Sequence, residues 1–449
     1  MSGSVSGVAK AVARRPALVV SDRACGLEPS GILDEAQHGF KAGRGPPTAG
    51  ISVMALYESA ERNRQPLTGI FLDIKKAYDS VERGAGKAMS LRRLGVDADT
   101  VEFLMHVDRG NTNWVRTGWE AMREREGWSQ PRFESYRGVA QGAVESPLLW
   151  VIFFDMILSQ LRKEGVGAST ETSTANGTLT GWGLVAFADD TSFFETTPLL
   201  AQLSATIVSQ VLALVCLNIA THKSLQMSLV WDRSTGKPEG KLRDEFLDHE
   251  NISMGGGKVP IAEHDEGLRY LGYWIDACSD CGNQVAQLQE KARRFRAAVE
   301  PARLTAREVM YLYNAVLIPR ITYCLTIAAP LTKDTDDLES STWSWMGPKI
   351  GLAPGQCREL LHTPRERGGL GLESWHSIVL RRRTDLAMEW CEEQGSTQME
   401  AIYSRLREDH EALKREGAWE GLGWGAPRPD GEGQWVEGLD CGLAVEGLS

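Results

Sequence analysis

Cysteine is scarce in this sequence, which contains 8 cysteines among 449 residues. Small secreted domains that depend on disulfides are much denser in cysteine, so a disulfide scaffold is excluded. Cys278 and Cys281 form a single Cys-x-x-Cys pair, and no second pair stands at zinc-ligand spacing from it. The sequence therefore predicts no structural zinc site.

Long apolar runs are also missing. The most apolar long window, residues 311–331, has Pro319 and Arg320 at its middle. These two residues favour a buried helix, turn and strand over a membrane-spanning helix. The first residues also lack the apolar segment that a secretory signal needs. We therefore expect no membrane partner.

Basic residues are in short supply, with 49 Lys and Arg against 60 Asp and Glu, a net charge of −11. This balance argues at first against a nucleic-acid partner, but the charge is unevenly distributed. Residues 384–449 hold 5 basic and 15 acidic side chains, so the rest of the chain is nearly neutral. Residues 283–333 hold 8 basic and 3 acidic side chains. That stretch has the composition of a site for a phosphate backbone, and equally that of a solvated helix face.

The sequence has enough apolar material for a folded core, because 42% of its residues are hydrophobic and 24% are charged. Apolar periodicity and turn residues predict strands mixed with helices. Helices are expected at 51–63, 146–161 and 199–217, strands at 68–73, 184–187, 191–194 and 225–229 and as short pairs within 109–137 and 267–276, a loop at 39–50, and mainly helices over 285–416. This order favours an α+β domain followed by a helical one.

Three acidic residues stand where strands are predicted to end. Asp73 follows one strand, and Asp189 and Asp190 form the tip of a predicted hairpin. Adjacent carboxylates repel one another unless a cation offsets their charge. Mg²⁺ suits such a place, since it binds one or two carboxylates together with substrate phosphates. Two such ions promote in-line phosphoryl transfer, whereas an ordinary polar turn would carry the same Asp-Asp pair without any ion.

Six segments follow one another in an order that is typical of one enzyme family. They are Gln37-His38-Gly39-Phe40 with Gly43-Arg44; Phe71-Leu72-Asp73-Ile74-Lys75-Lys76-Ala77-Tyr78-Asp79-Ser80-Val81; Arg137-Gly138-Val139-Ala140-Gln141-Gly142 followed by Ser146-Pro147-Leu148-Leu149; Phe187-Ala188-Asp189-Asp190; Leu217-Asn218 with Lys223-Ser224; and Tyr270-Leu271-Gly272. They resemble the motifs of reverse transcriptases, in the form found in non-LTR (LINE-type) retrotransposons. Each segment is weak alone, and the resemblance depends on their common order.

The resemblance implies a right-hand polymerase with an α+β fold. Its palm would be an antiparallel sheet with helices, its fingers truncated and its thumb or C-terminal region mainly helical. Residues 1–36 would be a poorly patterned N-terminal segment, 37–276 the remnant of the fingers and the palm, 277–383 the helical thumb or connecting region, and 384–449 an acidic, partly disordered tail. The implied activity is RNA-directed DNA polymerase, with an RNA template, a DNA primer and deoxynucleoside triphosphates as partners.

The resemblance also assigns the chemical roles. Asp73 and Asp189 would hold two Mg²⁺ ions, with Mn²⁺ as a substitute. Asp190 would stand beside them, and the Ile74 backbone carbonyl would be a further metal ligand. Lys223 would protonate the pyrophosphate leaving group as a general acid.

The remaining motif residues would bind substrates. Tyr78 would stack under the sugar of the incoming nucleotide and exclude a 2′-hydroxyl, although a packed core aromatic is the alternative. Three more residues would line the nucleotide: Ala77, Gln141 and Gly142. Arg137 would lie near the template strand. Three residues would form a hairpin that grips the primer end: Tyr270, Leu271 and Gly272.

A catalytically silent remnant of a retroelement, which keeps the fold and binds nucleic acid or a protein, is the alternative function. The three intact carboxylates favour the polymerase. The remnant is favoured by residues 1–36, which lack the family's basic Arg-Pro-Ile-type segment, and by Glu145, which would stand near the incoming phosphates. The sequence assigns no compartment, although action on genomic target DNA would place the protein in the nucleus or the cytoplasm.

Overall fold

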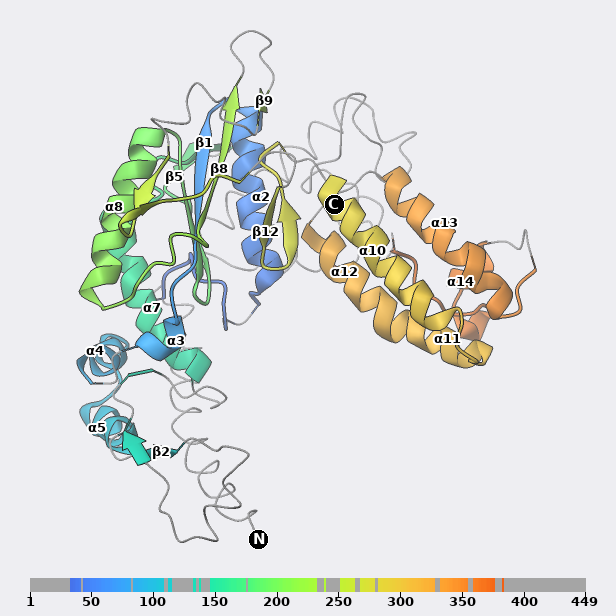
Figure 1. Cartoon of the computed structure of the whole chain (residues 1–449), viewed down its shortest axis with the longest axis horizontal. Helices are drawn as coiled ribbons and strands as arrows, with labels where there is room; N and C mark the ends of the chain where they lie inside the picture. The colour runs from blue at the N-terminus through green and yellow to red at the C-terminus, as the bar shows by residue number, and fades with distance from the viewer. Residues whose placement is uncertain are drawn as a thin grey trace.

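The computed structural model describes residues 33–41, 43–81, 84–108, 112–114, 132–134, 137–138, 146–174, 177–231, 238–239, 251–262, 267–278, 282–327, 332–353, 358–375 and 382. Gln141, Gly142, Glu145 and Cys281 lie outside these residues, as do residues 1–32 and the acidic region from 384 onward. A unit of sheet and helices lies beside a group of helices from the C-terminal half (Figure 1).

The central sheet has the strand order β6–β7–β1–β8–β9, with every pairing antiparallel. Its strands are β1 (Leu67–Leu72), β6 (Leu184–Phe187), β7 (Asp190–Glu195), β8 (Leu225–Trp231) and β9 (Pro238–Glu239). Helix α7 (Ser146–Lys163) connects β1 to β6, and helix α8 (Pro198–Leu214) connects β7 to β8. The chain thus follows the β-α-β-β-α-β arrangement. The predicted strands, the hairpin and both connecting helices are confirmed, and so is the α+β class.

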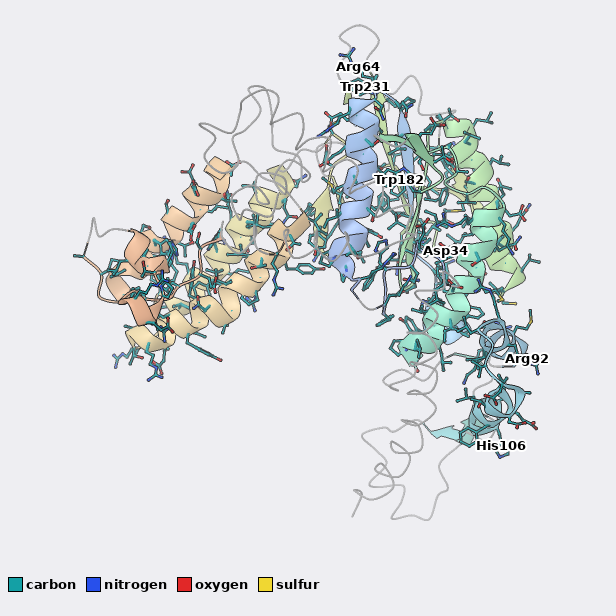
Figure 2. All side chains as sticks on the ribbon, turned by 180° about the vertical axis from the view of Figure 1, so that it is seen from behind. Asp34, Arg64, Arg92, His106, Trp182 and Trp231 are labelled. Atoms are coloured by element: carbon teal, nitrogen blue, oxygen red, sulfur yellow. The ribbon has the colours of Figure 1, made fainter. Side chains whose placement is uncertain are left out.

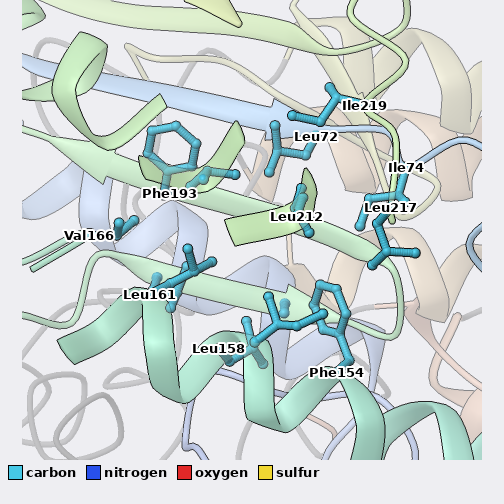
Figure 3. Close-up of a cluster of buried hydrophobic side chains, with 14 of the residues drawn as sticks. Leu72, Ile74, Phe154, Leu158, Leu161, Val166, Phe193, Leu212, Leu217 and Ile219 are labelled. Carbon is cyan, nitrogen blue, oxygen red and sulfur yellow. The ribbon is translucent and has the colours of Figure 1, made fainter. Parts of the chain in front are cut away.

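Strand β1 is central and buried along its whole length, because helices cover both faces of the sheet. Ile70 and Leu72 pack with α7 and α8 on one face, where Figure 3 shows Leu72 beside Phe193 and Leu212. On the other face Phe71 packs with α2 (Pro46–Arg62), whose place beside β1 and β8 is visible in Figure 1. The apolar character of β1 on both faces follows from this double cover.

Helix α2 corrects the prediction of a loop over residues 39–50. It begins at Pro46, five residues before the predicted helix at 51–63. Proline is tolerated in the first turn of a helix, since the N–H that it lacks would have no partner there. The Gly45 N–H donates to Thr48 Oγ1 at 3.0 Å and completes the N-terminus. The proline pair thus starts the helix.

Shorter elements surround the sheet. They are α3 (Ala77–Ser80), α4 (Ala85–Arg93), α5 (Ala98–Asp108), the strand pairs β2 (Thr112–Trp114) with β3 (Arg132–Glu134), β4 (Glu171–Thr174) with β5 (Gly177–Thr180) and β10 (Ser253–Met254) with β11 (Gly257–Lys258), and the hairpin β12 (Leu268–Tyr270) with β13 (Tyr273–Ile275). The predicted strand pairs within 109–137 and 267–276 are confirmed. Trp182, labelled in Figure 2, is buried in the same core cluster as α2.

The C-terminal half forms a helical group with its own core. It contains α10 (Gly282–Val299), α11 (Ala306–Leu312), the π-helix η2 (Tyr313–Leu317), α12 (Ile318–Ile327), α13 (Thr332–Lys349), α14 (Arg358–His362) and the 3₁₀ turn η3 (Arg365–Arg367). Large side chains such as Phe295, Tyr313 and Trp343 fill its core. The end of α12 packs on α2, where Ile327 lies so close to Gly50 that an added Cβ would stand 2.1 Å from Ile327 Cδ1. The predicted helical character is confirmed over the described residues.

The expected turn and strand after residue 311 are wrong, since the chain stays helical from Ala306 to Ile327. Pro319 is the second residue of α12, directly after η2. The Ile318 N–H bonds to Tyr313 O, five residues earlier, and so widens the turn before the proline. A wider turn accommodates a residue that has no N–H and whose ring otherwise collides with the preceding turn. No helix among the described residues is long and apolar enough to cross a membrane.

The packing of α2 on β1 predicts a specific cost at Gly69. A Cβ at this position would stand 2.5 Å from Tyr57 Oη and 2.6 Å from Phe194 Cε1. Because these rings are buried and cannot withdraw, Gly69→Ala should lower the free energy of unfolding by about 1–3 kcal/mol. Urea unfolding measures this change.

The matched control is Gly257→Ala in β11, where an added Cβ meets nothing closer than Thr221 Cγ2 at 3.5 Å, an ordinary van der Waals contact. Glycine is a poor strand residue, so this variant should be neutral or slightly more stable. Equal effects of the two substitutions would contradict the close packing at Gly69.

Candidate active site

The register of two strands brings the three predicted carboxylates together. Strands β1 and β7 pair up to Leu72 and Thr191. Asp73 directly follows Leu72, and Asp190 directly precedes Thr191, so the two aspartates end adjacent strands on the same side. Asp189 lies in the two-residue turn between β6 and β7. The sheet thus collects at one edge the carboxylates that the sequence separates by more than a hundred residues.

These carboxylates stand in a region of negative potential. Partial desolvation and then the charges of Asp189 and Asp73 raise the pKa of Asp190 to about 6, although this side chain keeps an exposed face. Desolvation also raises the pKa of the half-buried Asp189, and the charge of Asp73 adds to it. Within the described part of the chain, none of the three forms an ion pair with Lys or Arg. A bound cation would relieve this repulsion.

The donor set suits a hard divalent cation that shares its coordination with a substrate. Among the described residues, no three His, Cys, Asp or Glu side chains form a preformed metal cage. Mg²⁺ does not need one, because it keeps several waters and binds through one or two carboxylates plus phosphates. Paired carboxylates at a strand edge, without basic partners, fit that mode of binding.

The segment after α8 fixes the backbone around Asp73. The Asp73 N–H donates to Ser224 Oγ at 3.2 Å, and its carbonyl accepts from the Ala220 N–H at 2.8 Å. The Lys75 N–H bonds to Asn218 O at 2.8 Å, and Ile74 is bridged to Ile219. The fourth predicted motif therefore orients Asp73 and the backbone of Ile74. Ser224, to which the sequence assigned no role, is the side chain that does this.

Lys223 lies on the same segment and is exposed. Its backbone N–H bonds to Ala220 O at 2.8 Å, and its side chain forms no ion pair with the three carboxylates. The general-acid role of Lys223 stays a prediction.

Tyr78 faces both the carboxylates and the core. Its ring stacks on the buried Trp150 with centroids 4.9 Å apart. Burial, together with the charges of Asp189 and Asp190, raises the pKa of Tyr78 to about 12. The preceding Ala77 is buried. Packing and a place beside the carboxylates therefore coexist at Tyr78.

The described residues of the second motif, 137–138, contact the segment that follows Tyr78. The Gly138 N–H donates to Val81 O at 2.7 Å, and a Cβ on Gly138 would stand 3.0 Å from Asp79 Cα. The neighbouring Arg137 is exposed. Residues 137–138 thus lie next to the first motif, and the continuation that contains Gln141 and Gly142 lies outside the described residues.

The β12–β13 hairpin brings the last predicted motif to the same edge. Tyr270 is buried against Phe71, with ring centroids 5.3 Å apart. Burial and the charge of Asp190 raise the pKa of Tyr270 far above its usual value. Leu271 and Gly272 form the turn with φ of 47° and 86°, the combination of a type I′ turn. Leucine is unusual there, so another group has to hold it.

Tyr323 of α12 is that group, and no local sequence pattern predicts its contact with the turn. Its hydroxyl donates to Leu271 O at 2.6 Å, and its ring stacks on Tyr273 with centroids 4.5 Å apart. The contact joins residues 52 positions apart, so only the fold reveals it. The helical group therefore supports the turn of the predicted primer hairpin directly.

Part of the basic stripe on α10 is neutralised along its own helix. Arg293 and Arg294 both bond to Glu290, and Arg296 bonds to Glu300. These pairs are exposed and contribute little to stability. They leave the surface polar, with less positive charge than the count of basic residues indicates.

Comparison with known proteins identifies a family over the region that contains the predicted motifs. A family model described as reverse transcriptase (RNA-dependent DNA polymerase) matches residues 20–275, more than half of the chain. The chain belongs to the reverse transcriptase family. The match begins at residue 20, before the predicted start of the polymerase region at residue 37, and ends beside its predicted end at residue 276.

Relatives of this reverse transcriptase come from insect retrotransposons. It is 25% identical over 360 residues to the Pol polyprotein of the R2DM element of Drosophila melanogaster, covering 77% of the chain and 31% of the relative. It is 24% identical over 371 residues to an R2 polyprotein of Popillia japonica, covering 80% and 47%. The predicted resemblance to non-LTR retrotransposons is confirmed. The chain spans less than half the length of these relatives.

Solved structures similar to this reverse transcriptase include telomerases. The telomerase of Candida tropicalis in complex with a fragment of telomeric RNA matches with a TM-score of 0.40 at 11% identity, over 85% of this chain and 56% of that one. The apo telomerase of the same organism matches with a TM-score of 0.39 at 12% identity, over 87% and 61%.

The desolvation of Asp190 and its repulsion by the other two carboxylates predict that Asp190→Asn stabilises the metal-free fold. The pKa of Asp190 is raised above its ordinary 3.8, so ionisation costs folding free energy. This cost is absent below about pH 4 and complete above about pH 6. Because solvent screens an exposed group, we expect a gain of at most about 1 kcal/mol. Urea unfolding with a chelator at pH 8 and near pH 4 measures it.

Asp337→Asn on the exposed side of α13 is the control, since it removes one charge beyond the first turn of a helix that is remote from the carboxylates. A gain at pH 8 that is no larger for Asp190→Asn than for Asp337→Asn would contradict the proposed cost of ionising Asp190 in the fold.

Proposed function

We propose that this chain is an RNA-directed DNA polymerase that adds deoxynucleotides to a primer 3′ end by two-metal phosphoryl transfer. The observation that carries the proposal is the convergence of Asp73, Asp189 and Asp190 at one sheet edge beside Tyr78, where no Lys or Arg among the described residues forms an ion pair with them. Membership of the reverse transcriptase family supports the reaction class.

The reaction is an in-line displacement. The primer 3′-oxygen attacks the α-phosphate of the deoxynucleotide and forms a bond to its phosphorus. The bond from that phosphorus to the pyrophosphate oxygen breaks, and pyrophosphate leaves. Bound divalent ions would neutralise the developing charge on both oxygens. Asp73 and Asp189 would hold two Mg²⁺, or Mn²⁺ in their place, with Asp190 and the Ile74 carbonyl alongside. Lys223 would donate a proton to the pyrophosphate oxygen.

The incoming nucleotide would lie against Ala77 and Tyr78. The stack of Tyr78 on Trp150 supports this, because a ring backed by the core keeps its position when a sugar approaches. A ring fixed at this place would exclude a 2′-hydroxyl. Gln141 and Gly142 would complete the nucleotide site, and Arg137 would contact the template.

The β12–β13 turn would hold the primer end, and the helical group would act as the thumb. The bond from Tyr323 to Leu271 supports this assignment, since it joins the helices to the turn. Residues 37–276 would then comprise the palm with the fingers remnant, and 277–383 the thumb or connecting region. Residues 1–36 and the acidic 384–449 would flank them.

The partners would be an RNA template, a DNA primer and deoxynucleoside triphosphates. The relatives are Pol polyproteins of retrotransposable elements, which supports a retroelement origin. The RNA seen with one telomerase belongs to that protein and is no evidence for a particular template here.

Primer extension on an RNA template with Mg²⁺ and deoxynucleotides tests the proposed activity. The double variant Asp189→Asn with Asp190→Asn should lose extension by at least a thousandfold, because it removes the charge that holds the ions. Asp337→Asn is the matched control and should extend normally. A folded wild-type chain that binds primer–template and extends nothing would overturn the polymerase and favour the silent remnant.

Tyr78→Val tests the nucleotide site. A smaller side chain opens space at the sugar, so the preference for deoxynucleotides over ribonucleotides should fall on the order of tenfold. Competing extension with the two nucleotide types measures the ratio. A general loss of extension with an unchanged ratio of deoxynucleotide to ribonucleotide use would show that Tyr78 serves packing alone.

A further inference from the structure

Residues 36–38 add a short parallel segment to the free side of β6. Gln37 forms a parallel bridge with Ala186. The His38 N–H donates to Ala186 O at 2.7 Å, and the Ala186 N–H donates to Ala36 O at 2.8 Å. This places the Gln37 side chain at the end of β6, next to the turn that contains Asp189.

The Gln37 amide binds both backbone groups of one turn residue. Its Oε1 accepts from the Ala188 N–H at 2.8 Å, and its Nε2 donates to Ala188 O at 3.2 Å. The same oxygen also accepts from the Gly39 N–H at 2.8 Å. Gln37 is fully buried, so these bonds are shielded from water. The side chain thus brackets Ala188 as the backbone of a neighbouring strand would.

Ala188 needs such support because its backbone is strained. Its φ is 56°, in the left-handed region that residues other than glycine, Asn and Asp seldom adopt. Without a restraint, this residue would relax toward negative φ. Any such rotation redirects the following peptide and with it the Asp189 carboxylate. Strain of this kind persists only where the surroundings hold it.

The neighbouring glycine permits the contact. A Cβ on Gly39 would stand 2.5 Å from the Ala188 backbone nitrogen, so only glycine allows the two segments to approach so closely. The pattern Gln-x-Gly therefore has a physical reason here: the amide reaches the turn, and the glycine makes room for it.

The segment that carries Gln37 is anchored to α7. Arg162 donates two bonds to the Asp34 carboxylate, at 2.9 and 2.8 Å. The Asp34 N–H donates to the fully buried Asp155 at 2.5 Å, and Arg93 of α4 pairs with the other oxygen of Asp155. Asp34 is labelled in Figure 2. The segment that precedes Gln37 is therefore attached to α7 and α4 by a network of ion pairs and hydrogen bonds.

We propose that Gln37 is a positioning residue of the active site. By bracketing the left-handed Ala188, it fixes the direction of Asp189 relative to Asp73 and so sets the spacing at which divalent cations bind. The inference rests on the proposed function for its catalytic meaning, but its effect on metal binding is measurable without catalysis.

The variant Gln37→Met keeps the side-chain volume and removes all three hydrogen bonds. In the full chain it should raise the Mn²⁺ dissociation constant, and the Mg²⁺ concentration for half-maximal extension, on the order of tenfold, as loss of a group that orients a metal ligand does. Primer–template affinity should not change. Manganese titration followed by electron paramagnetic resonance reads the metal directly.

Gln226→Met is the matched control. Gln226 is a buried amide of the same sheet, but its Oε1 accepts from the Ile252 N–H at 3.2 Å, away from the catalytic turn. It should show the ordinary loss of stability from a buried amide and an unchanged manganese affinity. A purely structural role of Gln37 would make the two variants alike, which would overturn the proposal.

A second-site change tests the mechanism itself. Glycine adopts positive φ freely, so Ala188→Gly should keep the turn in place without the clamp. The double variant Gln37→Met with Ala188→Gly should recover at least a third of the lost manganese affinity. No recovery would contradict positioning through Ala188. If Gln37→Met does not fold, Gln37→Asn, which is too short to reach Ala188, replaces it.

The two proposals fail in different ways. If the wild-type chain binds Mn²⁺ through Asp189 and extends no primer, the polymerase is overturned, and the Gln37 variants still test positioning. If extension depends on Asp189 and the Gln37 variants bind Mn²⁺ as the wild type does, only the positioning role is overturned.

Discussion

The antiparallel pairing of β1 with β7 determines where the carboxylates of the candidate site lie. It ends with Leu72 opposite Thr191 and so forces Asp73 and Asp190 to share one edge of the sheet. Repulsion between their charges opposes this arrangement. Two apolar layers, one on each face of β1, keep the strands in register against that repulsion. A register shift of one residue would turn the β1 side chains of each layer toward the opposite face and disrupt the packing of both layers.

The edge is braced by segments from distant parts of the chain. Ser224 holds the backbone of Asp73, Gln37 holds that of Ala188, and Tyr270 packs on Phe71 beside Asp190. Each brace uses a different interaction: a hydroxyl acceptor, a bracketing amide and a buried ring. None of them carries charge to the carboxylates. The site is therefore rigid and remains open to cations, which is the combination that metal-assisted phosphoryl transfer requires.

Local signals predicted a large part of this architecture. The strands, the Asp-Asp hairpin and the helices α7 and α8 follow from apolar periodicity and turn residues, which act over a few positions. The motif resemblance predicted the three carboxylates that the sheet brings to one edge. Contacts between distant segments escaped prediction, as Gln37 with Ala188 and Tyr323 with Leu271 illustrate. The helix through Pro319 was missed for a related reason, because a π turn absorbs the proline and has no sequence signature of its own.

The turn at Leu271 is contacted both by the sheet and by the helical group. Tyr270, just before it, is coupled to the carboxylate edge through Phe71 and Asp190. Leu271 itself is held by Tyr323 from the helical group. A shift of the helices must therefore move the turn or break the bond to its carbonyl. In the proposed polymerase, the primer end would then be positioned by the same contact that joins the thumb to the palm. The strained Leu271 and Ala188 turns thus play parallel parts: each keeps a residue in the left-handed region because a side chain from a remote segment binds its backbone.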